Sequence, residues 1–298
     1  MKDNIDLRHM NKAIKIVNCQ RSKTYKVNLT DQLCTLCPNG KFVDIKRHCH
    51  NIVRFLYSEY PYEDHSQASW FQLASGIMNV EYVSDIFDND VMWCGPAIEY
   101  EQAKSHFHSN LITELTRFSF IWGGFESVID SITYDEYKSG PIGKISRLNY
   151  FLSKNYLPKY PIPVGYAETV DFFKLLLNHT DGYEENASYF IPDKNCSGDI
   201  VGIKAVYKIR NLFAHGSLKF SEPEEYNYSK EHGLVRPLDI DIIQTSSRIV
   251  LLTLQMLLTS VSNHLNFIVT KQHEYLDDKG VDAYLFLQNM HLKTFKHS

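Results

Sequence analysis

Three side chains that could act on a phosphodiester bond lie within six residues of one another, at Arg210, Asn211 and His215. A histidine with a pKa near neutrality can take a proton from an RNA 2′-hydroxyl or give one to the leaving 5′-oxygen. A guanidinium binds phosphate oxygens through paired hydrogen bonds and stabilises the charge that develops on phosphorus. An asparagine can orient either partner. This combination is suited to RNA cleavage without a metal, and attack by the 2′-hydroxyl would leave DNA intact.

The motif is predicted to end a helix that covers residues 199–215, because Gly216 supplies a stop signal directly after the histidine. Successive residues of a helix are separated by 100°, so Arg210 falls on the apolar side, about 140° from His215. The two side chains can meet only through a loosened last turn, the reach of the arginine side chain, or a second protomer. The opposite, polar face consists of Lys204, Lys208, Asn211 and His215.

An arginine on an apolar helix face must be paired with a carboxylate or lie at an interface, because burying an unpaired charge is costly. Glu126 is the candidate carboxylate, at the edge of the apolar stripe of a long helix predicted from about residue 97 onward. Gly123 and Gly124 interrupt that helix, which costs stability unless a neighbour needs close approach there. The stripe itself consists of Leu111, Leu115, Phe118, Trp122, Phe125, Ile129 and Ile132.

Other helical patterns cover residues 141–156 and 166–179, and a short one lies near 284–287. The pattern from residue 239 onward is apolar most of the way round, so that helix is predicted to be central. The predicted fold class is therefore mainly α, with a bundle of about four to six helices over residues 96–298.

Residues 1–95 are predicted to form a separate, small α/β or β-rich lobe, with strands at 24–29 and 41–45. Within it, a Cys-x-x-Cys pair on a turn is followed by His and Cys about a dozen residues later, which resembles half of a zinc knuckle. A structural zinc and a plain pair of reduced cysteines are both open, whereas a zinc hydrolase is disfavoured because such a site would be closed. The candidate ligands are Cys34, Cys37, His48 and Cys49.

Composition places limits on the class of protein. With 298 residues and 44% hydrophobic content the chain can bury an ordinary core, and its six cysteines are irregularly spaced. A formal charge of −4 argues against a nucleic-acid binder that works through global charge, but leaves a local basic surface open. The most apolar run, between Arg248 and His264, is too short and too polar for a membrane span. We therefore expect a cytoplasmic protein without a membrane partner.

The segment from Arg210 to His215, in the last turns of a helix within a helical bundle, resembles the Arg-x4-6-His motif of HEPN domains. The asparagine after the arginine and the Ala-His-Gly end are most similar to the ApeA-like branch. The segment from Trp122 to Ser127 is similar to the first helix of that branch, where an aromatic residue and a glutamate recur. The resemblance covers about residues 97–275 and does not extend to the N-terminal lobe.

The resemblance implies a homodimer in which two copies of the motif meet in one cleft. It also implies a metal-independent endoribonuclease with a toxin or anti-phage role. The resemblance also implies roles for individual residues. Arg210 and His215 would be catalytic, Asn211 would support them, and Glu126 would orient Arg210 or His215. No catalytic cofactor is expected.

Two functions are consistent with these residues. In the first, the protein cleaves RNA, such as tRNA or another structured RNA. The RNA would contact Lys204 and Lys208. An antitoxin or an activating partner would control the cleavage. In the second, a HEPN-like module without catalytic activity binds RNA, a nucleotide or a protein through the same cleft. An ordinary solvated face is an equally open reading of the two lysines.

Overall fold

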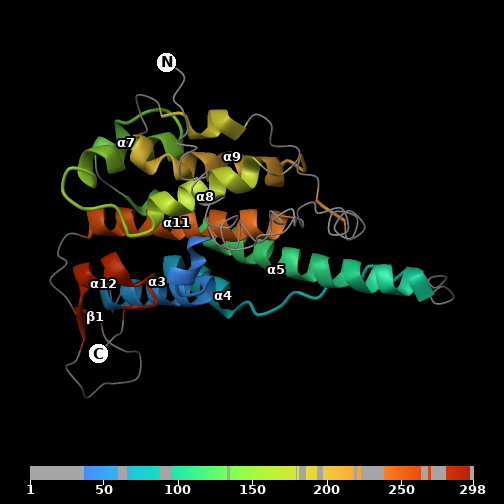
Figure 1. The fold of residues 1–298 in the computed structure, drawn as a ribbon. Helices are drawn as coiled ribbons and strands as arrows, with labels where there is room; N and C mark the ends of the chain where they lie inside the picture. Colours follow the sequence, from blue (N-terminus) through green and yellow to red (C-terminus); the bar gives the residue numbers. More distant parts are fainter. Residues whose placement is uncertain are drawn as a thin grey trace, which may run out of the picture.

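The computed structural model describes residues 37–59, 66–87, 95–132, 135–178, 180, 186–192, 197–217, 220–222, 238–262, 268–269 and 280–295. These residues are mainly helical, as predicted (Figure 1). The elements are η1 (Pro38–Lys41), α3 (Ile45–Glu59), α4 (Ser66–Gly76), α5 (Gly95–Ser131), α6 (Asp135–Lys138), α7 (Lys144–Asn155), α8 (Tyr166–Asn178), η3 (Asn186–Phe190), η4 (Gly198–Ile200), α9 (Gly202–Ala214), α11 (Asp239–Val261), β1 (Ile268–Val269), β2 (Val281–Asp282) and α12 (Ala283–Asn289).

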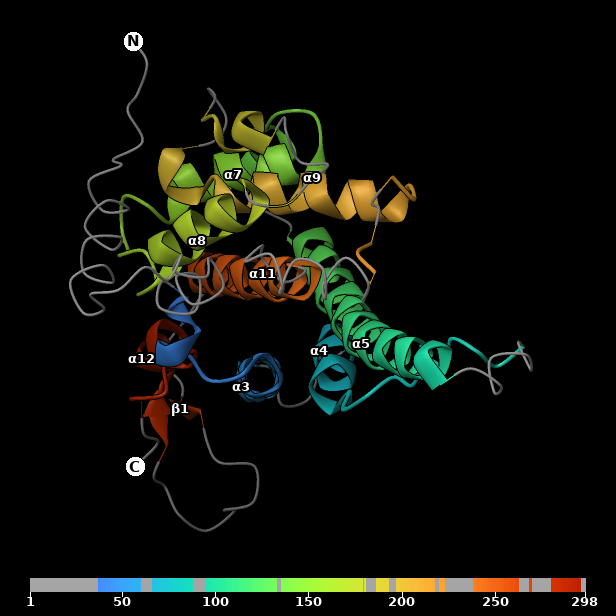
Figure 2. The same ribbon diagram turned by 45° about the vertical axis from the view of Figure 1, so that its right-hand side comes forward.

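Helix α11 lies at the centre of the fold, which confirms the prediction from its apolar pattern. Helices α7, α8 and α9 lie on one side of it, and α3, α4 and α12 on the other (Figures 1 and 2). Among the described helices, α11 alone is long and apolar enough to cross a membrane by length and composition, yet 94% of its most apolar window is buried within the fold. Core packing therefore accounts for its apolar sequence.

The described residues near the N-terminus form helices rather than a β-rich lobe. Helices α3 and α4 pack against each other, and their buried side chains belong to the same hydrophobic core as the bundle. The predicted strand at 41–45 is wrong, because Phe42 makes only an isolated bridge to Leu292 and α3 begins at Ile45. Asp44 explains the difference: its Oδ1 accepts a hydrogen bond from the amide of Arg47 at 2.7 Å, which is the bond of a helix N-cap. The predicted strand at 24–29 lies outside the described residues.

The long predicted helix is α5, and every residue of its predicted apolar stripe is buried. The expected close approach at its two glycines is also present. A Cβ on Gly123 would lie 2.8 Å from Cζ3 of Trp70, and one on Gly124 would lie 2.7 Å from Cζ of Phe71. Helix α4 therefore crosses α5 where α5 has no side chains.

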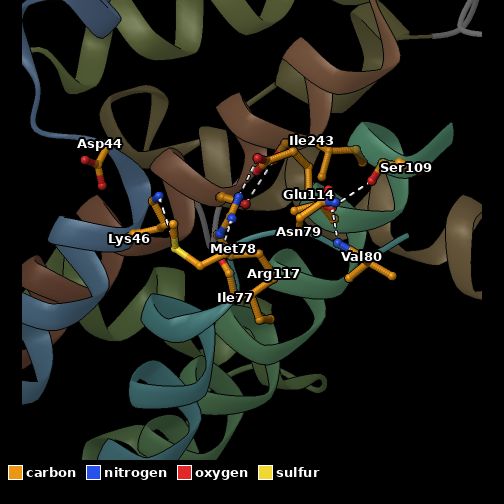
Figure 3. A network of polar contacts seen from close by, with 12 residues as sticks. Asp44, Lys46, Ile77, Met78, Asn79, Val80, Ser109, Glu114, Arg117 and Ile243 are labelled. Carbon is orange, nitrogen blue, oxygen red and sulfur yellow. Dashed lines mark hydrogen bonds and ion pairs between the residues drawn. The ribbon is translucent and has the colours of Figure 1, made fainter. Parts of the chain in front are cut away.

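The N-terminal half of α5 projects beyond the other helices, accompanied by a non-helical segment that ends in a turn, residues 77–87, which we call the strap (Figures 1 and 2). Figure 3 shows where the strap begins, with Arg117 donating from Nη2 to the carbonyl of Ile77 at 2.8 Å and pairing with Glu114. Four helical residues rise about 6.0 Å and two extended residues about 6.6 Å, so hydroxyls one turn apart match alternate strap amides. The resulting hydrogen bonds run from Val80 to Thr113 at 2.8 Å, from Tyr82 to Ser109 at 2.9 Å and from Ser84 to Ser105 at 3.0 Å.

Candidate functional site at the end of helix α9

Helix α9 carries the motif and ends as predicted, at Ala214 with His215 as its C-cap. The amide of His215 still donates to the carbonyl of Asn211 at 3.0 Å, so the last turn is regular. Gly216 then takes a φ of +65°, and its amide donates to the carbonyl of Phe213 at 3.1 Å. With the bond from Ser217 to Leu212 at 2.9 Å, this is a Schellman motif. A loosened last turn is therefore not what could bring Arg210 and His215 together.

Arg210 is half-buried, and its guanidinium lies over an aromatic ring rather than beside a carboxylate. Its Cζ atom is 6.0 Å from the centroid of the Trp122 indole on α5. Its one hydrogen bond is long, from Nη1 to Oδ1 of the neighbouring Asn211 at 3.4 Å. Among the described residues it forms no ion pair, so the expected pair with Glu126 is not made within this chain. Most of its N–H donors are therefore available to an anion.

Trp122 is held firmly between α5 and α9. It is 3% exposed, and Tyr207 of α9 stacks against it with ring centroids 6.2 Å apart and planes at 20°. Tyr207 precedes Arg210 by three residues, which places both on one helix face. Sequence reasoning missed this aromatic contact. The spacing of Tyr207 and Arg210 was a visible signal, but nothing local indicated which helix they would face.

Glu126 lies four residues after Trp122, so both side chains leave the same face of α5. Its side chain is half-buried, and within the described ranges it makes no hydrogen bond or ion pair. The carboxylate is thus near the aromatic contact in sequence and free to accept a partner.

The predicted polar face of α9 faces solvent, because Ile203, Val206 and Ile209 on the other side are fully buried. His215 is exposed, and its imidazole makes no hydrogen bond with another described residue. The remaining residues of the face differ in their contacts, since Lys204 donates from Nζ to the carbonyl of Ile191 at 3.2 Å while Lys208 is exposed.

No protein-family model, curated protein or solved structure matches this chain. The interpretation of the site therefore depends on its geometry and on the chemistry of its residues.

The predicted zinc ligands do not come together in the described part of the chain. His48 uses both ring nitrogens within the protein: Nδ1 accepts from Nη1 of Arg248 at 2.8 Å, and Nε2 donates to Oε1 of Gln255 at 2.9 Å. Burial raises the pKa of Cys49 to about 12, which keeps its thiol protonated. Cys37 is half-buried and Cys34 lies outside the described residues. The described residues contain no group of three His, Cys, Asp or Glu side chains that could hold a metal.

His48 belongs instead to a chain of directed hydrogen bonds inside the core. The carbonyl of Val164 can only accept, so Nε2 of His291 must donate to it, at 3.0 Å. Nδ1 of His291 then accepts from Nε2 of Gln255 at 3.1 Å, while Oε1 of the same amide accepts from His48. Both imidazoles are thereby held neutral, and burial lowers the pKa of His291 to about 4 and that of His48 well below its usual value. This network joins α3 and α11 to the segment after α12.

A cavity of about 490 Å³ lies between the strap and the first turns of α5. Carboxylates from both elements line it, namely Glu81, Asp85 and Glu101. Negative charge of this density repels a phosphate backbone, so this cavity is unsuited to RNA.

Proposed function

We propose that this protein is a metal-independent endoribonuclease of the HEPN type that acts as a homodimer. One observation carries the proposal. Arg210 is held against an aromatic ring with most of its donors unpaired, at the same helix end as a solvent-exposed His215. An unpaired guanidinium is prepared to bind phosphate, and an exposed imidazole can reach a bound nucleotide to accept or donate a proton.

The regular last turn of α9 supports a composite site. On a regular helix the positions of Arg210 and His215 lie about 140° apart around the axis, so the phosphate bound by Arg210 would be approached by the partner's His215. An imidazole takes the proton of the 2′-hydroxyl as O2′ attacks phosphorus. The bond from phosphorus to O5′ breaks, and the leaving oxygen receives a proton from an imidazolium. The products are a 2′,3′-cyclic phosphate and a free 5′-hydroxyl.

The other predicted site residues have roles consistent with their positions. Asn211 contacts the guanidinium through Oδ1 and would limit its rotation. Glu126 has no partner in the described chain and would orient an imidazole at the dimer cleft. Lys208, on the open polar face, would contact RNA such as tRNA or another structured RNA. A toxin or anti-phage role, controlled by an antitoxin or an activating partner, belongs to the same proposal.

A binding module without catalytic activity is the second candidate. One observation favours it: no described side chain orients the imidazole of His215, whereas a general base is normally held in position by a hydrogen bond. In that case the unpaired guanidinium would bind RNA, a nucleotide or a phosphorylated partner without cleavage.

Cleavage of total RNA in EDTA separates the two candidates. We expect the wild type to leave 2′,3′-cyclic phosphate ends and both Arg210→Ala and His215→Ala to lose this activity. Arg147→Ala is the matched control, because that arginine also lies over an aromatic ring, 5.2 Å from the centroid of Tyr137. His106→Ala removes another exposed histidine. Equal cleavage by the wild type and both motif variants would overturn the proposal, and binding without cleavage would favour the module.

A further inference from the structure

The guanidinium of Arg210 is held in a way that leaves its chemistry available. A carboxylate partner would occupy two of the five N–H donors of an arginine and neutralise its charge. An aromatic face attracts the cation without accepting a conventional hydrogen bond. A phosphate-binding arginine is therefore better oriented by a ring than by a glutamate. The described structure has the ring, Trp122, and no ion pair at Arg210.

The ring itself is fixed by its surroundings. Phe118 and Phe125, one turn before it and nearly one turn after it on α5, contact the indole with centroids 6.1 Å and 5.7 Å away. Tyr207 stacks against it from α9. On α5 the next two residues are glycines that admit α4, so the backbone beside Trp122 is also tightly packed. An indole that cannot move defines where the guanidinium lies.

The choice of tryptophan carries its own cost. Nε1 of Trp122 is buried and has no hydrogen-bond partner among the described residues. Phenylalanine would fill much of the same space without burying an unpaired donor. What tryptophan offers in exchange is the strongest attraction for a cation among the aromatic side chains. The position therefore uses the π face of the indole rather than its N–H group.

From these contacts we infer that Trp122 is the positioning residue for Arg210, in the role that the sequence resemblance gave to Glu126. The inference rests on the proposed ribonuclease function and deepens it. Trp122 is too buried to contact RNA, so it acts through the guanidinium alone. Tyr207 supports it from the other helix.

Kinetics with Trp122→Leu and Trp122→Phe test this role. Trp122→Leu should lower kcat about 10- to 100-fold with little change in KM. The reason is that the contact between Arg210 and the phosphate is strongest in the transition state. Trp122→Phe retains a π face and should keep kcat within about threefold of the wild type. An equal loss of kcat in Trp122→Phe and Trp122→Leu would show that the π face does not position Arg210 and would overturn the inference.

A second measurement does not depend on activity. A guanidinium over an indole experiences a ring current, so the side-chain NMR signals of Arg210, assigned with Arg210→Lys, should be shifted upfield. The shift should persist in Trp122→Phe and His215→Ala and vanish in Trp122→Leu. An unshifted Arg210 in the wild type would overturn the inference even if RNA is cleaved. Upfield-shifted Arg210 signals in a protein that cleaves no RNA would confirm the placement of the guanidinium. They would overturn the proposed function together with the role of Trp122 in cleavage.

Discussion

The amide of His215 donates to the carbonyl of Asn211 at 3.0 Å, so helix α9 keeps its regular turn up to the histidine of the motif. Arg210 leaves the helix on a different side, over Trp122 of α5. Nη1 of Arg210 also donates to Oδ1 of Asn211 at 3.4 Å, so the described contacts that place the guanidinium do not involve His215. Each of the two residues is placed on its own by a simple device, a Schellman motif for His215 and an aromatic face for Arg210.

Gly216→Ala should disturb the placement of His215. Gly216 has a φ of +65°, which an alanine adopts at a cost of about 1 kcal/mol. We expect a small fall in the free energy of unfolding, measured by urea denaturation, together with reduced RNA cleavage. Gly95→Ala is the control, because nothing lies within 4 Å of its Cβ position and its φ is ordinary. Equal stability of the two variants would contradict the strained turn.

The two adjacent glycines of α5 predict which of two alanine variants is the less stable. Gly124→Ala places a methyl group 2.7 Å from Cζ of Phe71, which is fully buried and cannot move aside. Gly123→Ala meets Trp70, which is 40% exposed and can swing outward. Alanine gains about 1 kcal/mol of helix propensity at both positions, while overpacking costs about 1–3 kcal/mol. Gly124→Ala should therefore be the less stable variant in denaturant titrations, and the reverse order would contradict the crossing of α4 and α5.

The buried histidines predict acid sensitivity. Burial lowers the pKa of His291 to about 4, below its ordinary value of about 6.5 in the unfolded chain. Between those pH values the unfolded chain binds a proton that the folded chain does not. Stability is therefore complete above about pH 6.5 and falls as the pH drops toward 4, by about 3 kcal/mol from this residue.

His291→Gln tests this directly, because an amide can still donate to Val164 but does not titrate. Its free energy of unfolding should vary less between pH 4 and pH 6.5 than that of the wild type. His106→Gln makes the same substitution at an exposed histidine and is the matched control. The idea fails if the wild type and His291→Gln follow parallel curves.

Lys208 is the lysine of the polar face with no described partner, whereas Lys204 already donates to a carbonyl. Lys208→Ala should raise KM for RNA, leave kcat nearly unchanged and reduce the slope of log affinity against log salt by about 1. Lys159→Ala removes an exposed lysine elsewhere and should change neither quantity. Identical salt slopes for the three proteins would show that the polar face does not contact RNA.

Local signals in the sequence were sufficient for α5, α7, α8 and α11 and for the end of α9, but not for α3 and α4. The stripe from Leu111 to Ile132 has helical spacing over many turns, and a glycine after a histidine is a strong stop. Contacts between distant segments could not be derived in this way. His48 is a candidate zinc ligand in the sequence because cysteines lie nearby, whereas the hydrogen-bond partners of its ring are Gln255 and Arg248, about 200 residues away.

The contact between Arg210 and Trp122 could not be predicted for the same reason, because it joins segments that are distant in sequence. The periodicity of α9 places Arg210 on one side of the helix, but only the contacts of Trp122 with α9 show that Arg210 lies over an indole and forms no ion pair with Glu126. The strand predicted at 41–45 does not form for a local reason, since Asp44 caps the helix that begins at Ile45.

Mixing two inactive variants is the most direct measurement of the central claim, a site shared between protomers. Arg210→Ala and His215→Ala, carrying different tags, are co-expressed and the mixed dimer is purified. The mixed dimer keeps one intact pairing of Arg210 with the partner's His215, so about half of the wild-type cleavage should return. A mixed dimer as inactive as both parents would contradict the shared site.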